Sequence, residues 1–162
     1  MMNRKQWTVS LYLLFVAMTL GAVLVLGIFV TSVIFHSDRV LSNVLLDHYN
    51  EGQLMAEIFR RFTYWGYVMV GVIALFEVSE YKNGRRDKIV MISAFIAIAT
   101  LLLFSAVYTP KILEIQAMGI EATQNDAFAA LHSASEIDFK ILAVALGVLF
   151  IRRMHLMFVA KK

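Results

Sequence analysis

The chain has 162 residues, 60% of them hydrophobic, and its mean hydropathy of +0.71 is too high for a soluble domain and indicates one membrane domain covering residues 1–162. The absence of cysteine excludes disulfides, thiolate metal sites, iron–sulfur clusters and a cysteine nucleophile. The net charge of +3 is not gathered into a basic stripe with interleaved aromatic residues, which argues against a nucleic-acid partner.

Four apolar runs predict four transmembrane helices, at residues 8–35, 60–80, 88–109 and 135–158. The uncharged run that contains the first span would reach about 45 Å as a helix, which is longer than a hydrocarbon core of ~30 Å. The third span is expected to end at Thr109, because Pro110 disfavours helical geometry in the residue before it. These runs predict an all-α fold, an integral membrane four-helix bundle.

Between the first two spans, residues 36–61 carry apolar side chains at helical spacing, interrupted near Gly52. This pattern predicts an amphipathic outer helix that lies on the membrane and leads into the second span. Its apolar positions are Val40, Leu41, Val44, Leu45, Leu54, Met55, Ile58 and Phe59.

The fourth span is unusual, because only eleven uncharged residues separate Lys140 from Arg152. They would form about 16 Å of helix, roughly half a bilayer. The helix is therefore expected to extend outward to a cap at Thr123 or Asn125, and inward past Arg152. Charged groups inside a span usually face a bundle interior or a water-filled cavity, so the outer entrance of this span is the place where we expect a functional site.

The distribution of basic residues predicts the orientation of the chain. Ten Lys and Arg residues lie on the side of the two termini and the 77–88 loop, and five lie on the other side. The positive-inside rule then places both termini in the cytoplasm. The outer side carries nine of the twelve acidic residues.

Several polar residues near the outer side are candidates for a site. Glu57 with Arg61, and Glu136 with Lys140, have the i,i+4 spacing typical of ion pairs on a helix surface. The functional interpretation is that these groups meet in one polar pocket at the outer end of the bundle. The candidates for this pocket are His132, Ser135, Glu136, Asp138, Lys140, Glu57 and Arg61.

Histidines on the same side suggest a metal or haem site as an alternative. His132 and Glu136 lie on one helical face and could bind the same ion. The full set of candidate ligands is His132, His36, His48 and Glu136, with a transition metal or haem iron as the candidate cofactor. The competing interpretation is a polar cap over the bundle, in which His132 only hydrogen-bonds to the neighbouring connection.

Four short motifs at the span ends resemble a known family. They are Val33-Ile34-Phe35, Ile58-Phe59-Arg60-Arg61-Phe62, Tyr108-Thr109-Pro110 and Leu131-His132-x-x-Ser135-x-x-Asp138. With them the chain resembles the bacterial four-span membrane family with a domain of unknown function of the 4149 type, which is similar to transmembrane protein 205. That family usually has a small polar residue, often Asn, where this chain has Asp138. Its helix arrangement is similar to the copper-resistance-D and protoporphyrinogen-oxidase-like bundles, which favours the metal or haem alternative somewhat.

We therefore expect a bacterial inner-membrane protein of unknown biochemical role, a non-enzymatic component with a polar site at its outer end. Its surroundings are the lipid bilayer, with a homo-oligomer or another membrane protein as a candidate partner. Two alternatives stay open. One is a metal or haem handling membrane protein, and the other is a small transporter or channel subunit that uses Asp138 and Lys140 along a pathway. An enzyme is disfavoured because no nucleophile or cofactor motif is recognisable.

Overall fold

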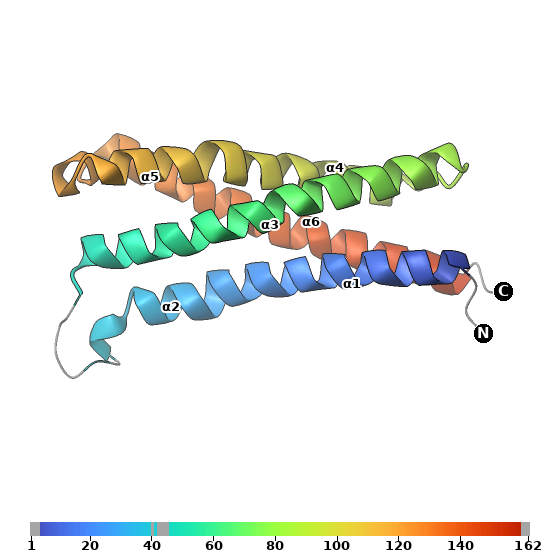
Figure 1. Ribbon diagram of the computed structural model, residues 1–162, viewed down its shortest axis with the longest axis horizontal. Helices are drawn as coiled ribbons and strands as arrows, with labels where there is room; N and C mark the ends of the chain where they lie inside the picture. The colour runs from blue at the N-terminus through green and yellow to red at the C-terminus, as the bar shows by residue number, and fades with distance from the viewer. Residues whose placement is uncertain (1–3, 40, 42–45, 160–162) are drawn as a thin grey trace.

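The computed structural model describes residues 4–39, 41 and 46–159, and these form four long helical columns (Figure 1). The first column is α1 (Arg4–Leu24), the π-helix η1 (Val25–Val30) and α2 (Thr31–Ile34), and the second is α3 (His48–Lys82). The third is α4 (Lys88–Leu103), the π-helix η3 (Phe104–Tyr108) and α5 (Thr109–Ala117), and the fourth is α6 (Asp126–Val159). Two short 3₁₀-helices, η2 (Ser37–Arg39) and η4 (Ile120–Thr123), lie in the connections. The described residues contain no strand.

The bundle has two distinct ends. The start of α1, the 83–87 turn and the end of α6 lie together at one end, called the inner end below (Figure 1). The short helices η2 and η4 lie at the opposite end, called the outer end. This arrangement follows from the even number of helical columns, which brings both ends of the described chain to the same side.

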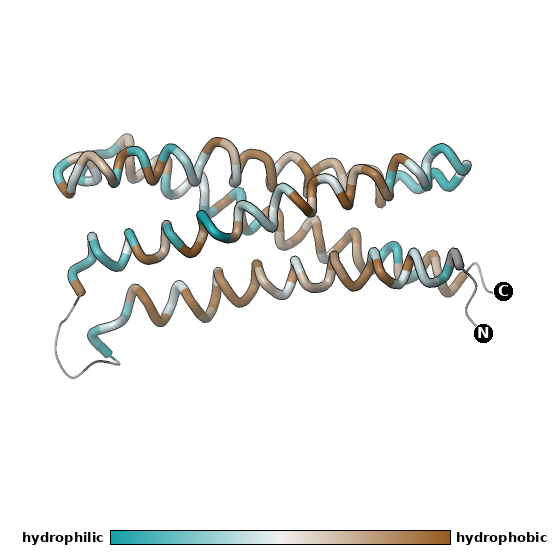
Figure 2. Tube along the Cα trace, in the orientation of Figure 1, coloured by the Kyte–Doolittle hydropathy of each residue, from teal (hydrophilic) through white to brown (hydrophobic). Residues whose placement is uncertain are grey.

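All four columns are long and apolar enough to cross a membrane: Gln6–Ile34, His48–Lys82, Lys88–Ala117 and Asp126–Val159. Hydrophobic residues cover the middle of the bundle and hydrophilic ones gather toward its ends (Figure 2). Large apolar side chains such as Leu75, which is 77% exposed, point away from the bundle and suit contact with lipid. The prediction of an all-α membrane helical bundle is confirmed, and the chain is a multi-pass membrane protein.

The interior is apolar and closely packed. α6 packs mainly against α4 and α1, while α3 packs against α4. In the outer half of the bundle, four rings from three columns meet with centroid distances between 4.8 and 6.2 Å: Phe59, Phe62, Phe104 and Phe139. We call this group the phenylalanine cluster. Since lipid tails are as apolar as these side chains, the packing is stabilised by close van der Waals contact rather than by transfer from water.

The prediction that the third helix ends at Thr109 is wrong. Thr109 has helical backbone angles (φ −59°, ψ −49°), and the column continues to Ala117. The π-helix η3 just before it explains the difference. The Thr109 N–H donates to the carbonyl of Phe104, an i→i+5 bond, and such local adjustments let a membrane helix accommodate a proline that cannot donate.

The second half of the predicted outer amphipathic segment is helical, but it is continuous with the second span and does not form a separate helix. Residues 48–59 are the first turns of α3, which begins after Asp47 accepts a hydrogen bond from the Asn50 N–H (2.8 Å). Its buried apolar face includes Met55 and Ala56. The predicted apolar positions Val40, Val44 and Leu45 lie outside the described residues.

The predicted cap of α6 is confirmed at Asn125. Its side-chain Oδ1 accepts a hydrogen bond from the Phe128 N–H at 2.8 Å, and its carbonyl accepts from the Ala129 N–H at 3.1 Å. The helix then continues both outward past Lys140 and inward past Arg152 without a break.

Candidate functional site

The candidate residues on α3 form a local ion-pair group. Glu57 accepts hydrogen bonds from Arg60 (2.6 Å) and from Arg61 (2.9 Å), and Arg60 also donates to the Tyr64 hydroxyl (3.0 Å). The Arg61 side chain is 76% exposed. These charged side chains therefore lie on α3 just before its uncharged stretch, residues 62–76.

The candidates on α6 divide between two faces. Glu136 is exposed and approaches His132 (3.3 Å) and Lys140 (3.4 Å), both one turn away on the same helix. Ser135 and Asp138 are buried on the side facing the bundle. In the described part of the chain, every ion pair of these seven candidates therefore joins two residues of the same helix. Of the seven, only His132 and Ser135 line the cavity described below.

Asp138 is the least satisfied of these groups. Its Oδ2 atom is buried and has no hydrogen-bond partner. The outward-pointing Lys140 is paired with Glu136 instead. A buried carboxyl within a span normally faces a bundle interior, as Asp138 does, and this position is one turn below the cavity-lining Ser135.

The other two histidines lie at the outer end. The ring Nδ1 of His36 lies 2.9 Å from the carbonyl of Ser32, one turn earlier. His48 lies 3.4 Å from Glu51, and Glu51 accepts a 2.6 Å bond from Ser37, which joins η2 to α3. Over residues 4–39, 41 and 46–159 the structure holds no group of three His, Asp or Glu side chains placed to share a metal ion.

A cavity of about 520 Å³ opens between α3, the α4–α5 column and α6 at the outer end. This volume is in the range of small-molecule sites. The surface of its walls is mainly apolar, with several polar side chains among the aromatic and aliphatic ones. The lining residues are Phe35, Asp47, His48, Tyr49, Gly52, Met55, Ala56, Phe59, Phe104, Thr109, Ile112, Gln116, Ile120, Thr123, Gln124, Phe128, Ala129, His132 and Ser135.

Gln116 is one of three buried polar side chains that line this cavity, together with Thr109 and Ser135. It is 8% exposed, and its side-chain Oε1 is buried without a hydrogen-bond partner. Its backbone carbonyl accepts a 2.6 Å bond from the Tyr49 hydroxyl, which joins α5 to α3. The amide lies close to Gly52 of α3, where a Cβ would be in contact with Gln116 Nε2 at 3.4 Å.

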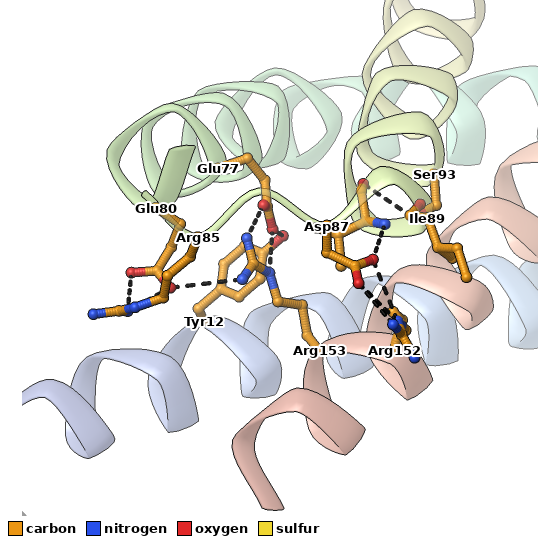
Figure 3. Close-up of polar contacts among 10 residues, drawn as sticks. Tyr12, Glu77, Glu80, Arg85, Asp87, Ile89, Ser93, Arg152 and Arg153 are labelled. Carbon is orange, nitrogen blue, oxygen red and sulfur yellow. Dashed lines mark hydrogen bonds and ion pairs between the residues drawn. The ribbon is translucent and has the colours of Figure 1, made fainter. Parts of the chain in front are cut away.

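At the inner end, a buried ion pair joins three columns (Figure 3). Arg153 of α6 donates to both carboxylate oxygens of Glu77 on α3, and the Tyr12 hydroxyl of α1 donates to Glu77 Oε1 at 2.8 Å. The Arg153 and Glu77 side chains are only 7% and 11% exposed. The ring of Phe76 stacks on Tyr12 at 3.8 Å and lies under the Arg153 guanidinium.

Two flanking ion pairs complete this inner-end cluster (Figure 3). Arg85 donates to Glu80 at 2.6 Å, and Arg152 donates to Asp87 at 2.7 Å. Asp87 also caps α4 by accepting from the Val90 N–H at 3.1 Å. Its hydrogen bonds from Arg152 hold the pKa of the Asp87 carboxyl below its ordinary value, despite some burial that acts the other way.

The sequence patterns do not predict the inner-end cluster: they place Glu77 near the inner end of the predicted span 60–80 and extend the fourth helix inward past Arg152. The available signal was the short uncharged stretch before Arg152. Charges that cannot leave a span must find partners, and Glu77 ends the neighbouring uncharged run at the same end of the bundle. Tyr12 had no such signal, since aromatic residues are common in membrane helices.

Comparison with known proteins gives one match. No curated protein and no solved structure matches the chain. The model of a family described as "Domain of unknown function (DUF4149)" matches residues 14–121, which is more than half of the chain and covers most of the first span and all of the second and third. The chain therefore belongs to the DUF4149 family.

Proposed function

We propose that this protein is a non-enzymatic component of a bacterial inner membrane, with both termini in the cytoplasm, that binds an amphiphilic membrane molecule in its outer-end cavity. The observation that carries this proposal is the cavity itself. It combines mainly apolar walls with several buried polar side chains, among them Gln116, whose Oε1 has no hydrogen-bond partner. Sites for small amphiphiles have this composition.

The depth of the cavity supports the same function. On α3, the uncharged residues between Arg61 and Glu77 span about 22 Å, so Arg60 and Arg61 are near the outer edge of the hydrocarbon core. The cavity-lining part of α3, from His48 to Phe59, lies on the outer side of these charges. A ligand there would sit at the level of the lipid headgroups, with its apolar part directed toward the phenylalanine cluster.

The site candidates fit this proposal in different ways. His132 and Ser135 line the cavity and are proposed to contact the ligand. Glu57, Arg61, Glu136 and Lys140 are proposed to position the outer ends of α3 and α6 at the membrane surface through their helix-surface ion pairs. Asp138, buried below Ser135, is proposed to contribute polarity beneath the cavity rather than a direct contact.

The proposed orientation can be tested directly, because the chain contains no cysteine and single cysteines can be introduced freely. Asn83→Cys in the inner turn and Gln124→Cys in the outer connection are both at exposed positions. A membrane-impermeant maleimide added to intact inner-membrane spheroplasts is expected to label the cysteine at 124 and not the one at 83. The reverse pattern would show that the orientation is wrong.

The proposed ligand binding can be tested by photo-crosslinking in native membranes. A photoreactive side chain at Met55, which is buried and lines the cavity, is expected to form an adduct with one enriched class of amphiphile. The same side chain at Leu75, which faces outward within the second span, serves as the control and should capture bulk phospholipid. If position 55 gives no lipid adduct, or the same mixture as position 75, the proposed function is wrong.

A further inference from the structure

We propose that the ligand of the outer-end cavity is an uncharged lipid that carries a free hydroxyl group, held by a hydrogen bond between that hydroxyl and the side-chain amide of Gln116. This inference rests on the proposed function and names the chemical class of the molecule bound there. It depends on three observations: an acceptor without a partner, the charges of the lining, and the order of polar and apolar groups along the cavity.

The Gln116 amide is a built polar site. Its Oε1 is buried and has no partner, although buried polar atoms are nearly always hydrogen-bonded in folded proteins. The Tyr49 hydroxyl fixes the backbone of this residue by donating to its carbonyl, and the side-chain Nε2 lies close to Gly52 of α3. An amide in this position offers both an acceptor and a donor to a ligand. A hydroxyl matches it, because one hydroxyl donates to Oε1 and can also accept from a neighbouring N–H.

The charges of the lining select against an ionic headgroup. Among the residues that the structure describes, the lining of this cavity includes no Lys or Arg, and Asp47 is its one carboxylate. Phosphate headgroups are normally bound by Arg or Lys, so a phospholipid would find no cationic partner there and would face the charge of Asp47. The two lining histidines, His48 and His132, are each beside a carboxylate of their own helix. An uncharged headgroup therefore fits best.

The cavity is polar at its outer part and apolar at depth. Gln116 lies near the end of α5, twelve residues after Phe104, which places them about 18 Å apart along the helical column. Phe104 and Phe59 line the deep part, where their rings meet at 5.2 Å. A hydroxyl at Gln116 and a hydrocarbon chain directed toward these rings match the order of groups in a neutral lipid, with its head toward the aqueous side.

The test compares three probes that differ only in the headgroup. The full-length protein in phosphatidylcholine nanodiscs is titrated with dioleoylglycerol, with its O-methyl ether, and with dioleoylphosphatidic acid, and binding is measured by native mass spectrometry. We expect dioleoylglycerol to bind about tenfold more tightly than the ether, which corresponds to one hydrogen bond. We also expect it to bind more tightly than the phosphatidic acid.

Two variants connect this preference with Gln116. Gln116→Leu keeps the approximate volume of the side chain and is expected to erase the preference for the free hydroxyl, so that dioleoylglycerol and its ether bind alike. Gln53→Leu is the matched control, since it removes an exposed amide near the outer end that is not part of the cavity lining, and it should leave the preference unchanged. The comparison of probes on the unaltered protein requires neither variant to fold.

The possible results separate this inference from the proposed function. Equal binding of dioleoylglycerol and its ether, or tighter binding of phosphatidic acid, would overturn the neutral hydroxyl lipid while leaving an amphiphile site in place. Retention of the preference in Gln116→Leu would overturn the role of Gln116. If none of the probes binds and the photoreactive group at position 55 captures no lipid, the proposed function fails together with the inference.

Discussion

Replacing Arg153 with Met is expected to destabilise the bundle strongly, because it removes the cation from a buried ion pair. Arg153 is 7% exposed and donates to both oxygens of Glu77, whose only other hydrogen-bond donor in the cluster is Tyr12. The variant leaves a carboxylate buried without a counter-charge. Breaking a buried pair in this way costs about 3–5 kcal/mol, and 4 kcal/mol would lower the folding equilibrium constant about a thousandfold.

The measurement is equilibrium unfolding in mixed micelles with increasing SDS, followed by tryptophan fluorescence. The matched control is Arg152→Met, which removes the neighbouring arginine from a pair with Asp87 that is more exposed, and its loss should be clearly smaller. The double variant Glu77→Gln/Arg153→Met should recover much of the lost stability, since neither charge is then left alone. The reasoning is refuted if Arg153→Met is no less stable than Arg152→Met, or if the double variant is as unstable as the single one.

Three further outcomes follow from the packing and charges. Arg152 lowers the pKa of Asp87, so their pair stabilises the fold above about pH 4 and this stabilisation is lost as the pH falls further. Thermal melts should therefore show a smaller loss of stability in acid for Asp87→Asn than for the unaltered protein, and equal losses would contradict this. Gly66→Val should lower the free energy of unfolding by about 1–3 kcal/mol through overpacking, because even a Cβ there would lie 2.7 Å from Ser105 Oγ. Gly71→Val is the control, since a Cβ there meets nothing within 4 Å, and equal melting temperatures of the two variants would contradict this prediction. Tyr12→Phe keeps the ring stacked on Phe76 but loses the hydrogen bond from the hydroxyl to the Glu77 carboxylate. The free energy of unfolding in SDS should fall by about 1.5–3 kcal/mol, and no measurable decrease would count against that hydrogen bond.

Much of the fold could be predicted because hydrophobic spans and helix caps are local signals. The four apolar runs and the cap at Asn125 each depend on neighbouring residues, and the structure confirms both. The prediction that the third helix ends at Thr109 also used a local signal, the preference of the residue before proline for extended geometry. It is wrong because the π-helix η3, which lets the helix continue past Pro110, is not visible in that signal.

The candidate site was only partly accessible from the sequence. Helical spacing correctly paired Glu136 with Lys140 and Glu57 with Arg61, because these partners lie on one helix. It could not show that Gln116 faces Gly52, since this contact joins two columns that are far apart in the sequence.

The inner-end cluster shows the same limit at larger separation. Arg153 and Glu77 are 76 residues apart, and their contact depends on how α3 and α6 pack. Charge and hydropathy indicate that each residue needs a partner, but several acids and bases lie at similar depth. Only the packing of the helices decides which of them meet.

The central claim, that the outer-end cavity holds an amphiphile, is tested most directly by filling the cavity. Gly52→Leu places a large apolar side chain beside the Gln116 amide, whereas Gly71→Leu places the same side chain on the same helix where nothing lies within 4 Å of a Cβ. Native mass spectrometry of protein purified from membranes in nanodiscs measures the lipid that each form retains. The account predicts one enriched amphiphile on the unaltered protein and on Gly71→Leu, and its loss from Gly52→Leu. Equal retention by Gly52→Leu and Gly71→Leu would contradict it.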